Sequence, residues 1–395
     1  MRVLVALTYY RPHISGVTIY AERLARGLAR HGHQVTILTS RYDPTLAARE
    51  QHDGIEVIRV PVWRKVSKGV IMPHFPAHVA TLARQHDIVN IHMPQFEAAL
   101  LALCGRLSGK GVVLTYHCDL SLPHGPFNRI VQASLHPLNH LAARLAHRVV
   151  ATSTDYAAHS RFLRRFSAKL AAIPPLVEMA PPDATVTQRL KDRWQLNGRT
   201  CIGFAARFAA EKGVEYLLEA LPLVLEQIPD AQLVFTGAYK DTVGEEQYRA
   251  HVTPLLRRHA DRITFLDLLR DEEMPSFFSL CDVVAVTSLN RTEAFGLVQI
   301  EAMLSGTPVV ASNLPGVREA VRQTGMGELV APRDAGGLAA ALVRVIRQRA
   351  HYVRPRAEIA QAFDIDAAIR QYEALFAPLL PAAIDVDELL RQPGR

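Results

Sequence analysis

Short apolar runs rich in β-branched residues alternate with amphipathic stretches along almost the whole chain. Stretches such as 20–30 and 126–147 have the spacing of helices that bury one face. This alternation predicts an α/β fold with parallel sheets covered by helices on both faces. The predicted strands are Val3–Leu7, Val35–Ser40, Glu56–Val60, Ile88–His92, Val112–His117, Val149–Ser153, Cys201–Ala205, Gln232–Gly237, Ile263–Leu266, Val283–Ser288 and Pro308–Ser312.

The length of the chain favours two domains, because 395 residues exceed what one ordinary core organises. The alternation breaks between residues 173 and 199, where Pro174-Pro175 and Pro181-Pro182 resist both helix and sheet. Two doubly wound domains that face each other place their strand ends, and thus their binding loops, in a cleft. We expect an N-terminal Rossmann-like domain over 1–175, a second over 176–355 and C-terminal helices over 356–395.

Composition indicates a soluble globular protein, with 49% hydrophobic and 21% charged residues. No apolar run reaches the roughly 18–20 residues of a membrane span, and Val3–Leu7 is too short for a signal-peptide core. The four cysteines form no close pair. They therefore predict neither a zinc site nor a disulfide framework, and they favour the reducing cytoplasm.

Charge is divided unevenly along the chain. Residues 1–180 hold 21 Lys/Arg and 10 Asp/Glu, a net +11, whereas the remainder holds 24 and 28, a net −4. The basic half suggests an anionic partner, but no nucleic-acid-binding motif accompanies it. Residues 161–166 and 63–68 mix basic with aromatic or apolar residues. Either is a solvated face or a peripheral contact with an anionic membrane, and the charge bias favours the membrane.

A basic loop follows the predicted strand Cys201–Ala205. Arg207 and Lys212 can converge on a diphosphate, since Arg supplies a fork of donors and Lys a point charge. Gly213 allows a tight turn into a helix that opens at Val214. Basic residues at a helix start oppose the helix dipole, and this mismatch favours an anion over an ordinary surface loop.

Two glutamates bracket a glycine turn in the second half. Glu293 lies just before Phe295-Gly296-Leu297, and Glu301 lies about two turns into the helix that follows. A helix start with free N–H groups suits a phosphate, whereas carboxylates beside it suit the hydroxyls of a sugar or ribose. The alternative is a charged helix start with an exposed glutamate.

Two further candidates end strands of the first domain. His117 follows Val112–Thr115 and can donate to a sugar hydroxyl or shuttle a proton. Gly16 lies in the loop after the first strand, where it can let backbone N–H groups approach a ligand or serve the loop's shape alone. That loop has no Gly-x-Gly-x-x-Gly, which counts against a dehydrogenase.

Two Asp-x-Asp sequences do not indicate a metal site. Asp364-Ile-Asp366 and Asp385-Val-Asp387 both lie in the C-terminal helical region, where helix N-capping explains them better. We therefore expect no bound metal.

With these residues together, the chain resembles the retaining glycosyltransferases of family 4, which have the GT-B fold. The resemblance extends over essentially the whole length and is strongest at 207–213 and 293–310, where Glu293 and Glu301 match the paired-glutamate motif. It implies that the last helices cross back onto the first domain. It departs at Cys118, where the family often has Asp, at Pro174-Pro175-Leu176 in place of Pro-Asn-Gly, and at Asp267 in place of a glycine.

The resemblance assigns roles to the candidate residues. Arg207 and Lys212 would bind the donor diphosphate, and Glu301 the nucleotide ribose. Glu293 would contact the donor sugar with the backbone of 295–297 beside it. His117 matches the cleft histidine of the family, and Gly16 matches its glycine loop near the donor phosphates.

These observations predict a cytoplasmic enzyme that moves a sugar from a UDP- or GDP-sugar to an acceptor hydroxyl with retention, without a metal or cofactor. The acceptor is expected to be a glycan, a lipid-linked sugar or a small molecule of cell-surface glycan or glycolipid synthesis. Another GT-B enzyme, such as a sugar-nucleotide epimerase or a phosphorylase, and a non-catalytic sugar-nucleotide-binding subunit are the alternatives.

Overall fold

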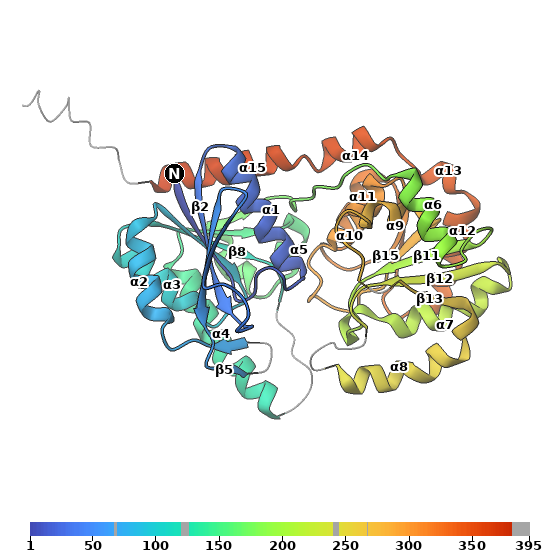
Figure 1. Ribbon diagram of the computed structural model, residues 1–395, viewed down its shortest axis with the longest axis horizontal. Helices are drawn as coiled ribbons and strands as arrows, with labels where there is room; N and C mark the ends of the chain where they lie inside the picture. The colour runs from blue at the N-terminus through green and yellow to red at the C-terminus, as the bar shows by residue number, and fades with distance from the viewer. Residues whose placement is uncertain (67–68, 120–125, 240–244, 267, 381–395) are drawn as a thin grey trace, which may run out of the picture.

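The computed structural model describes residues 1–380 except 67–68, 120–125, 240–244 and 267. Two α/β domains lie side by side, each built around its own mainly parallel sheet (Figure 1). Asp267, residues 67–68 and the Asp385-Val-Asp387 sequence, discussed above, fall outside the described residues.

The first domain contains an eight-stranded sheet of order β10-β9-β8-β7-β1-β2-β4-β3. All neighbours are parallel except β3 and β4, which form an antiparallel edge. Its strands are β1 (Arg2–Ala6), β2 (Gln34–Arg41), β3 (Arg49–His52), β4 (Ile55–Pro61), β7 (Ile88–Met93), β8 (Gly111–Tyr116), β9 (Arg148–Ala151) and β10 (Leu170–Ala172). A separate hairpin joins β5 (Arg64–Val66) to β6 (Gly69–Ile71).

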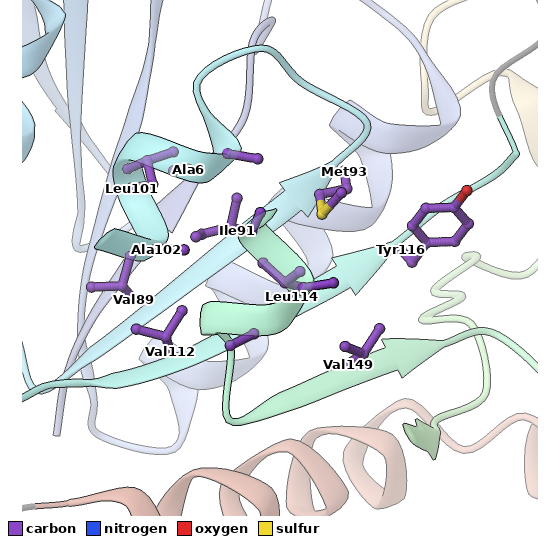
Figure 2. Close-up of a cluster of buried hydrophobic side chains, with 14 of the residues drawn as sticks. Ala6, Val89, Ile91, Met93, Leu101, Ala102, Val112, Leu114, Tyr116 and Val149 are labelled. Carbon is purple, nitrogen blue, oxygen red and sulfur yellow. The ribbon is translucent and has the colours of Figure 1, made fainter. Parts of the chain in front are cut away.

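Helices cover both faces of this sheet, because successive strand residues point to opposite sides. Val3 and Val5 pack in one core cluster with α1, whereas Leu4 and Ala6 pack in the other with α2 and α3. Figure 2 shows this second cluster, where side chains of β7 and β8 meet those of α3. The helices are α1 (Gly16–Arg30), α2 (Phe75–Gln85), α3 (Ala98–Leu107), α4 (Pro126–Leu145) and α5 (Thr154–His159).

The second domain contains a six-stranded, all-parallel sheet of order β13-β12-β11-β14-β15-β16. Its strands are β11 (Thr200–Ala205), β12 (Ala231–Thr236), β13 (Ile263–Phe265), β14 (Val283–Val286), β15 (Val309–Ser312) and β16 (Gly327–Val330). Its helices are α6 (Ala184–Arg193), α7 (Val214–Leu225), α8 (Glu246–Arg258), α9 (Met274–Leu280), α10 (Leu297–Leu304), α11 (Glu319–Thr324), α12 (Ala335–Arg347) and α13 (Arg349–Tyr352).

The chain returns to the first domain at its end. Helices α14 (Arg356–Ala362) and α15 (Ile365–Phe376), red in Figure 1, run from the second domain to α1. Asp364 caps α15 by accepting from the backbone N–H groups of Asp366 and Ala367, so the first Asp-x-Asp is a helix cap, as the sequence predicted. The hydroxyl of Tyr372 on α15 hydrogen-bonds to those of Tyr20 and Thr115 inside the first core.

All eleven predicted strands are present, with ends shifted by a residue or two. The prediction extended the fifth and sixth strands too far, because His117 and Ser153 begin connections rather than continue the sheet. Five strands were not predicted, namely β3, β5, β6, β10 and β16. Each of these strands has only three or four residues, too few to show a clear apolar alternation. In β3, all four residues are in addition exposed.

Candidate functional site

The loop 207–213 connects β11 to α7 and is fastened to the neighbouring strand end. Gly213 has φ +63°, and a Cβ there would lie 2.4 Å from the carbonyl oxygen of Thr287, so only glycine fits without strain. The hydroxyl of Thr287 donates to the Lys212 carbonyl at 2.7 Å, and the Leu289 N–H donates to the Glu211 carbonyl at 2.8 Å. These contacts fix the position of Lys212 relative to the loop after β14.

The loop after β14 carries Glu293, which forms an ion pair with Lys212. The Ser288 hydroxyl lies 3.4 Å from the same carboxylate oxygen. Arg207 is paired with Glu211, and 41% of its side chain is exposed. The structure therefore brings Lys212 and Glu293 together, with Arg207 earlier in the same loop.

Gly296 forms the junction between this loop and α10. It has φ +78° and is the N-cap of the helix. A Cβ there would lie 2.9 Å from the Gln299 side-chain nitrogen. The Phe295 side chain is buried against Phe363, so at this residue only the backbone can face a ligand. The backbone N–H groups at the start of α10 supply the positive end of a helix dipole.

Glu301, in the second turn of α10, is held by a residue of the first domain. The Arg23 guanidinium on α1 donates to Glu301 Oε1 at 2.8 Å, and the two side chains are 13% and 10% exposed. Arg23 also donates to the carbonyls of Leu176 and Glu178 in the connection between the domains. Glu301 Oε2 accepts no hydrogen bond from the described residues and is left for a further donor.

His117 and Gly16 both belong to the first domain, His117 directly after β8 and Gly16 at the start of α1. The backbone N–H of His117 donates to the Met93 carbonyl at 3.0 Å, which fastens the start of this connection to the end of β7. Burial lowers the pKa of His117 to about 3, so its ring is neutral at physiological pH. Gly16 is the first residue of α1, where Ser15 is the N-cap, and a Cβ on Gly16 would meet nothing within 4 Å.

Electrostatic effects show that the candidate residues of the two domains share one space, here called the domain junction. Burial, followed by the charge of Glu293, raises the pKa of the Cys118 thiol to about 12. Burial and the nearby Arg207 guanidinium lower the pKa of His13, in the loop before α1. The loops that carry His117, Glu293 and Arg207 therefore converge.

Besides the Arg23–Glu301 ion pair, two further links connect the domains at the junction, and no sequence pattern predicted either. Asp155 on α5 accepts from the Gly316 N–H at 2.8 Å and from Arg318 at 2.6 and 2.9 Å. The Tyr156 hydroxyl donates to the Arg291 carbonyl at 2.8 Å and accepts from the Asp119 N–H at 2.6 Å. Tyr156 thus joins the loop after His117 to the loop before Glu293. Each link connects residues over a hundred positions apart, so no local pattern reveals it.

A further carboxylate lies on the first domain, directly before α3. Burial raises the pKa of Glu97 to about 7, and the charge of Glu97 adds to the raised pKa of Tyr9. No local pattern in the sequence singled out Glu97, whose raised pKa depends on its surroundings in the folded chain.

The proposed membrane patch at 161–166 is partly contradicted. Phe162 is buried and stacks on Tyr116 at 4.6 Å between ring centroids, and Phe166 packs against the same core. The three arginines of this segment are exposed, and Phe166 is partly buried. In the 63–68 segment, Trp63 is 73% exposed. Within the described residues, no helix combines the length and apolarity needed to cross a bilayer.

Across residues 1–380, with the gaps stated above, no group of three or more His, Cys, Asp or Glu side chains is placed to hold a metal ion. The basic side chains Arg207 and Lys212 and the start of α10 are the features suited to an anionic ligand.

Comparisons with known proteins agree with this arrangement. Residues 15–175 match the glycosyl transferase 4-like domain, and residues 187–362 match glycosyl transferases group 1. The chain is 26% identical over 373 residues to an uncharacterized glycosyltransferase of Methanocaldococcus jannaschii, covering 88% of this chain and 89% of that protein. It is 27% identical over 373 residues to a GDP-mannose-dependent alpha-(1-6)-phosphatidylinositol monomannoside mannosyltransferase of Mycobacterium tuberculosis, with 88% and 90% covered.

A solved structure shares the fold. Anabaena HepE in complex with UDP-glucose superposes with a TM-score of 0.77 at 19% identity, covering 96% of this chain and all of that one. The two facing α/β domains, the crossover of the last helices and both domain matches lead to one conclusion. The chain is a glycosyltransferase with the GT-B fold and belongs to family 4, the glycosyl transferases of group 1.

Proposed function

We propose that this enzyme transfers a sugar from a UDP- or GDP-sugar to an acceptor hydroxyl with retention at the anomeric carbon and without a metal. The observation that carries the proposal is the Lys212–Glu293 ion pair beside the start of α10. The pair places a cation for a diphosphate directly beside a carboxylate for sugar hydroxyls. Both are held by backbone contacts before any ligand binds.

Charge develops on the diphosphate as the bond to the sugar breaks. Lys212, Arg207 and the N–H groups at the start of α10 stabilise that charge more strongly than the charge of the bound donor. A lysine ammonium has three donors, so Lys212 can contact a phosphate oxygen while it keeps Glu293. In the same-face reaction proposed here, the leaving phosphate accepts the proton of the acceptor hydroxyl.

The nucleotide ribose is assigned to Glu301. Its Oε1 accepts from Arg23, and the remaining Oε2 suits a ribose hydroxyl. Arg23 belongs to the first domain, so ribose binding would take place at a carboxylate that already connects the two domains. His117 is assigned to a hydroxyl of the transferred sugar.

The acceptor is proposed to be a lipid-linked or phosphorylated compound of cell-surface glycan or glycolipid synthesis, met at the cytoplasmic face of the membrane. The net +11 of residues 1–180 supports this, as does the exposed Trp63. The mycobacterial relative named above acts, by its name, on a phosphatidylinositol mannoside. Electrostatic contact predicts binding to anionic liposomes that weakens with salt. Equal binding to neutral liposomes would contradict it.

The first experiment is a thermal-shift titration with UDP, GDP, ADP and their sugar conjugates, since a ligand of the folded state raises its stability by mass action. A preferred nucleotide fixes the donor class. Conversion of the sugar nucleotide without any acceptor would instead indicate an epimerase. Binding without slow donor hydrolysis would indicate a non-catalytic subunit.

The second experiment tests the phosphate assignment. Lys212→Ala should cost about 2–4 kcal/mol of transition-state stabilisation, the scale of losing one preorganised donor. Lys191→Ala is the matched control, because Lys191 lies on α6 and forms no ion pair with the described residues. The readout is kcat/KM for donor hydrolysis. Near-wild-type turnover of the Lys212 variant would refute the assignment.

A further inference from the structure

Two histidines of the first domain form a hydrogen-bonded pair beside the domain junction. His92 lies on β7 and His117 follows β8, so neighbouring parallel strands hold the two rings side by side. His92 Nδ1 and His117 Nε2 are 2.8 Å apart, and the ring planes are inclined by 23°. The ring of Tyr20 packs edge-on against both imidazoles. Packing as well as the hydrogen bond therefore fixes their orientation.

The second nitrogen of His92 decides the direction of this hydrogen bond. His92 is 1% exposed, and its Nε2 is buried without a hydrogen-bond partner among the described residues. A proton on Nε2 would leave an N–H group buried without an acceptor, an arrangement that folded proteins rarely contain. The hydrogen-bonding network therefore assigns the proton of His92 to Nδ1, which donates to His117 Nε2.

This assignment also determines the proton position of His117. A neutral imidazole carries one ring proton, and because His117 Nε2 accepts, the proton is on Nδ1. Burial keeps the pKa of both rings low, so neither becomes an imidazolium at physiological pH. His117 Nδ1 forms no hydrogen bond with any described residue. His117 as a residue is only partly buried, and its Nδ1–H is left for a ligand.

We propose that His92 is a positioning residue that holds His117 in the Nδ1–H tautomer, so that His117 offers a fixed hydrogen-bond donor, not a base, to a hydroxyl of the donor sugar. The contact with sugar rests on the proposed function, whereas the tautomer does not. His92 touches no substrate and acts through His117 alone. The pair removes one of the two roles that the sequence left open for His117, that of a proton shuttle.

The tautomer is measured on the wild-type protein without substrate. Histidine labelled with 15N in the ring distinguishes a protonated from a bare nitrogen by its chemical shift, and the His92→Asn and His117→Ala variants assign the signals. The expected spectrum has a protonated Nδ1 and a bare Nε2 for both His92 and His117. A protonated Nε2 on His117 would overturn the proposal, whatever the activity of the protein.

Turnover tests whether the tautomer matters. His92→Leu removes the donor to His117 and should lower kcat by up to about a hundredfold, the scale of misplacing one group in an active site, with a smaller change in KM. His92→Asn, whose amide nitrogen lies near the place of Nδ1, should recover most of that loss. Unchanged kcat in the leucine variant would overturn the positioning role.

The two proposals fail in different ways. A wild-type protein that shows the expected tautomer but turns over no sugar nucleotide refutes the proposed function and leaves the histidine pair as described. Normal turnover with the opposite tautomer refutes the positioning role and leaves the function. Thermal stability of each variant separates a loss of kcat from a loss of folding.

Discussion

A single added methyl group tests how tightly the loop 207–213 is built. Gly213 is buried, has φ +63°, and a Cβ would lie 2.4 Å from the Thr287 carbonyl oxygen and 2.7 Å from the Leu289 side chain. A backbone carbonyl cannot rotate away as a flexible side chain can. Gly213→Ala must therefore separate the 207–213 loop from the loop after β14, and with it Lys212 from Glu293.

Gly198 provides the matched control for this variant. It has φ +73°, and a Cβ there would meet nothing within 4 Å. A left-handed conformation costs an alanine about 1–2 kcal/mol, offset by about 0.4–1 kcal/mol from a less flexible unfolded chain. Gly198→Ala should therefore cost about 0–1.5 kcal/mol. Overpacking at Gly213 adds about 1–3 kcal/mol, so Gly213→Ala should cost about 1–4.5 kcal/mol.

The chain has two tryptophans, Trp63 in the first domain and Trp194 in the second. In a Trp63→Phe background, fluorescence during urea unfolding reports on the domain that contains both glycines. The free energies of unfolding of the two alanine variants are compared there, together with kcat/KM, which should fall only for Gly213→Ala. Equal losses of stability in both variants would refute the reasoning, because strain alone would then explain them.

Three other perturbations address the domain junction and the first domain. Asp155→Ala should cost about 1–3 kcal/mol of stability by removing its hydrogen bonds to Arg318. Burial raises the pKa of Asp155, but its hydrogen bonds outweigh burial and lower the pKa overall. The contribution of these bonds to stability should therefore disappear as the pH falls below about 4. Urea unfolding of the wild type and the variant at a series of pH values measures it. Arg23→Ala should cost about 2–4 kcal/mol, because it leaves Glu301 a mostly buried unpaired carboxylate; thermal unfolding unchanged from the wild type would contradict this. The pKa of Glu97 is raised to about 7, so the wild type should lose stability as the pH rises from about 4.5 past 7. Glu97→Gln should therefore be the more stable protein above pH 7, by about 2–3 kcal/mol. Equal stability of the two proteins at pH 8 would count against that burial effect.

The sequence predicted what depends on local periodicity. Most residues of β7 and β8 are apolar or β-branched, and all of them are buried, as is typical of parallel strands. Parallel strands end in loops that share one edge of the sheet. The same rule placed Lys212 and Glu293, which follow β11 and β14, at one edge of the second sheet, and the prediction of two facing domains placed His117 opposite them. Strand β3 was missed because its four residues are all exposed and no apolar face marks it.

The contacts between the domains could not be predicted in the same way. Arg23 and Glu301 are 278 positions apart, and each alone resembles an ordinary charged residue of a helix. His92 did carry a signal that went unused. It interrupts an apolar run in which every residue is buried, and a polar side chain in such a place needs a hydrogen-bond partner. That requirement points to a residue on an adjacent strand, which is where His117 lies.

The crossover of α15 sets an order for folding during synthesis. Ile369 fills the space that a Cβ on Gly27 would occupy, with its Cδ1 2.5 Å from that position, and Tyr372 completes the hydrogen bonds of Tyr20. The first domain leaves the ribosome first, yet its outer layer is supplied by residues made last. Until residue 376 emerges, the side of α1 that contacts α15 stays uncovered and prone to association with other chains. Cutting the protein at the connection between its domains should therefore leave an N-terminal fragment that is less soluble than the whole.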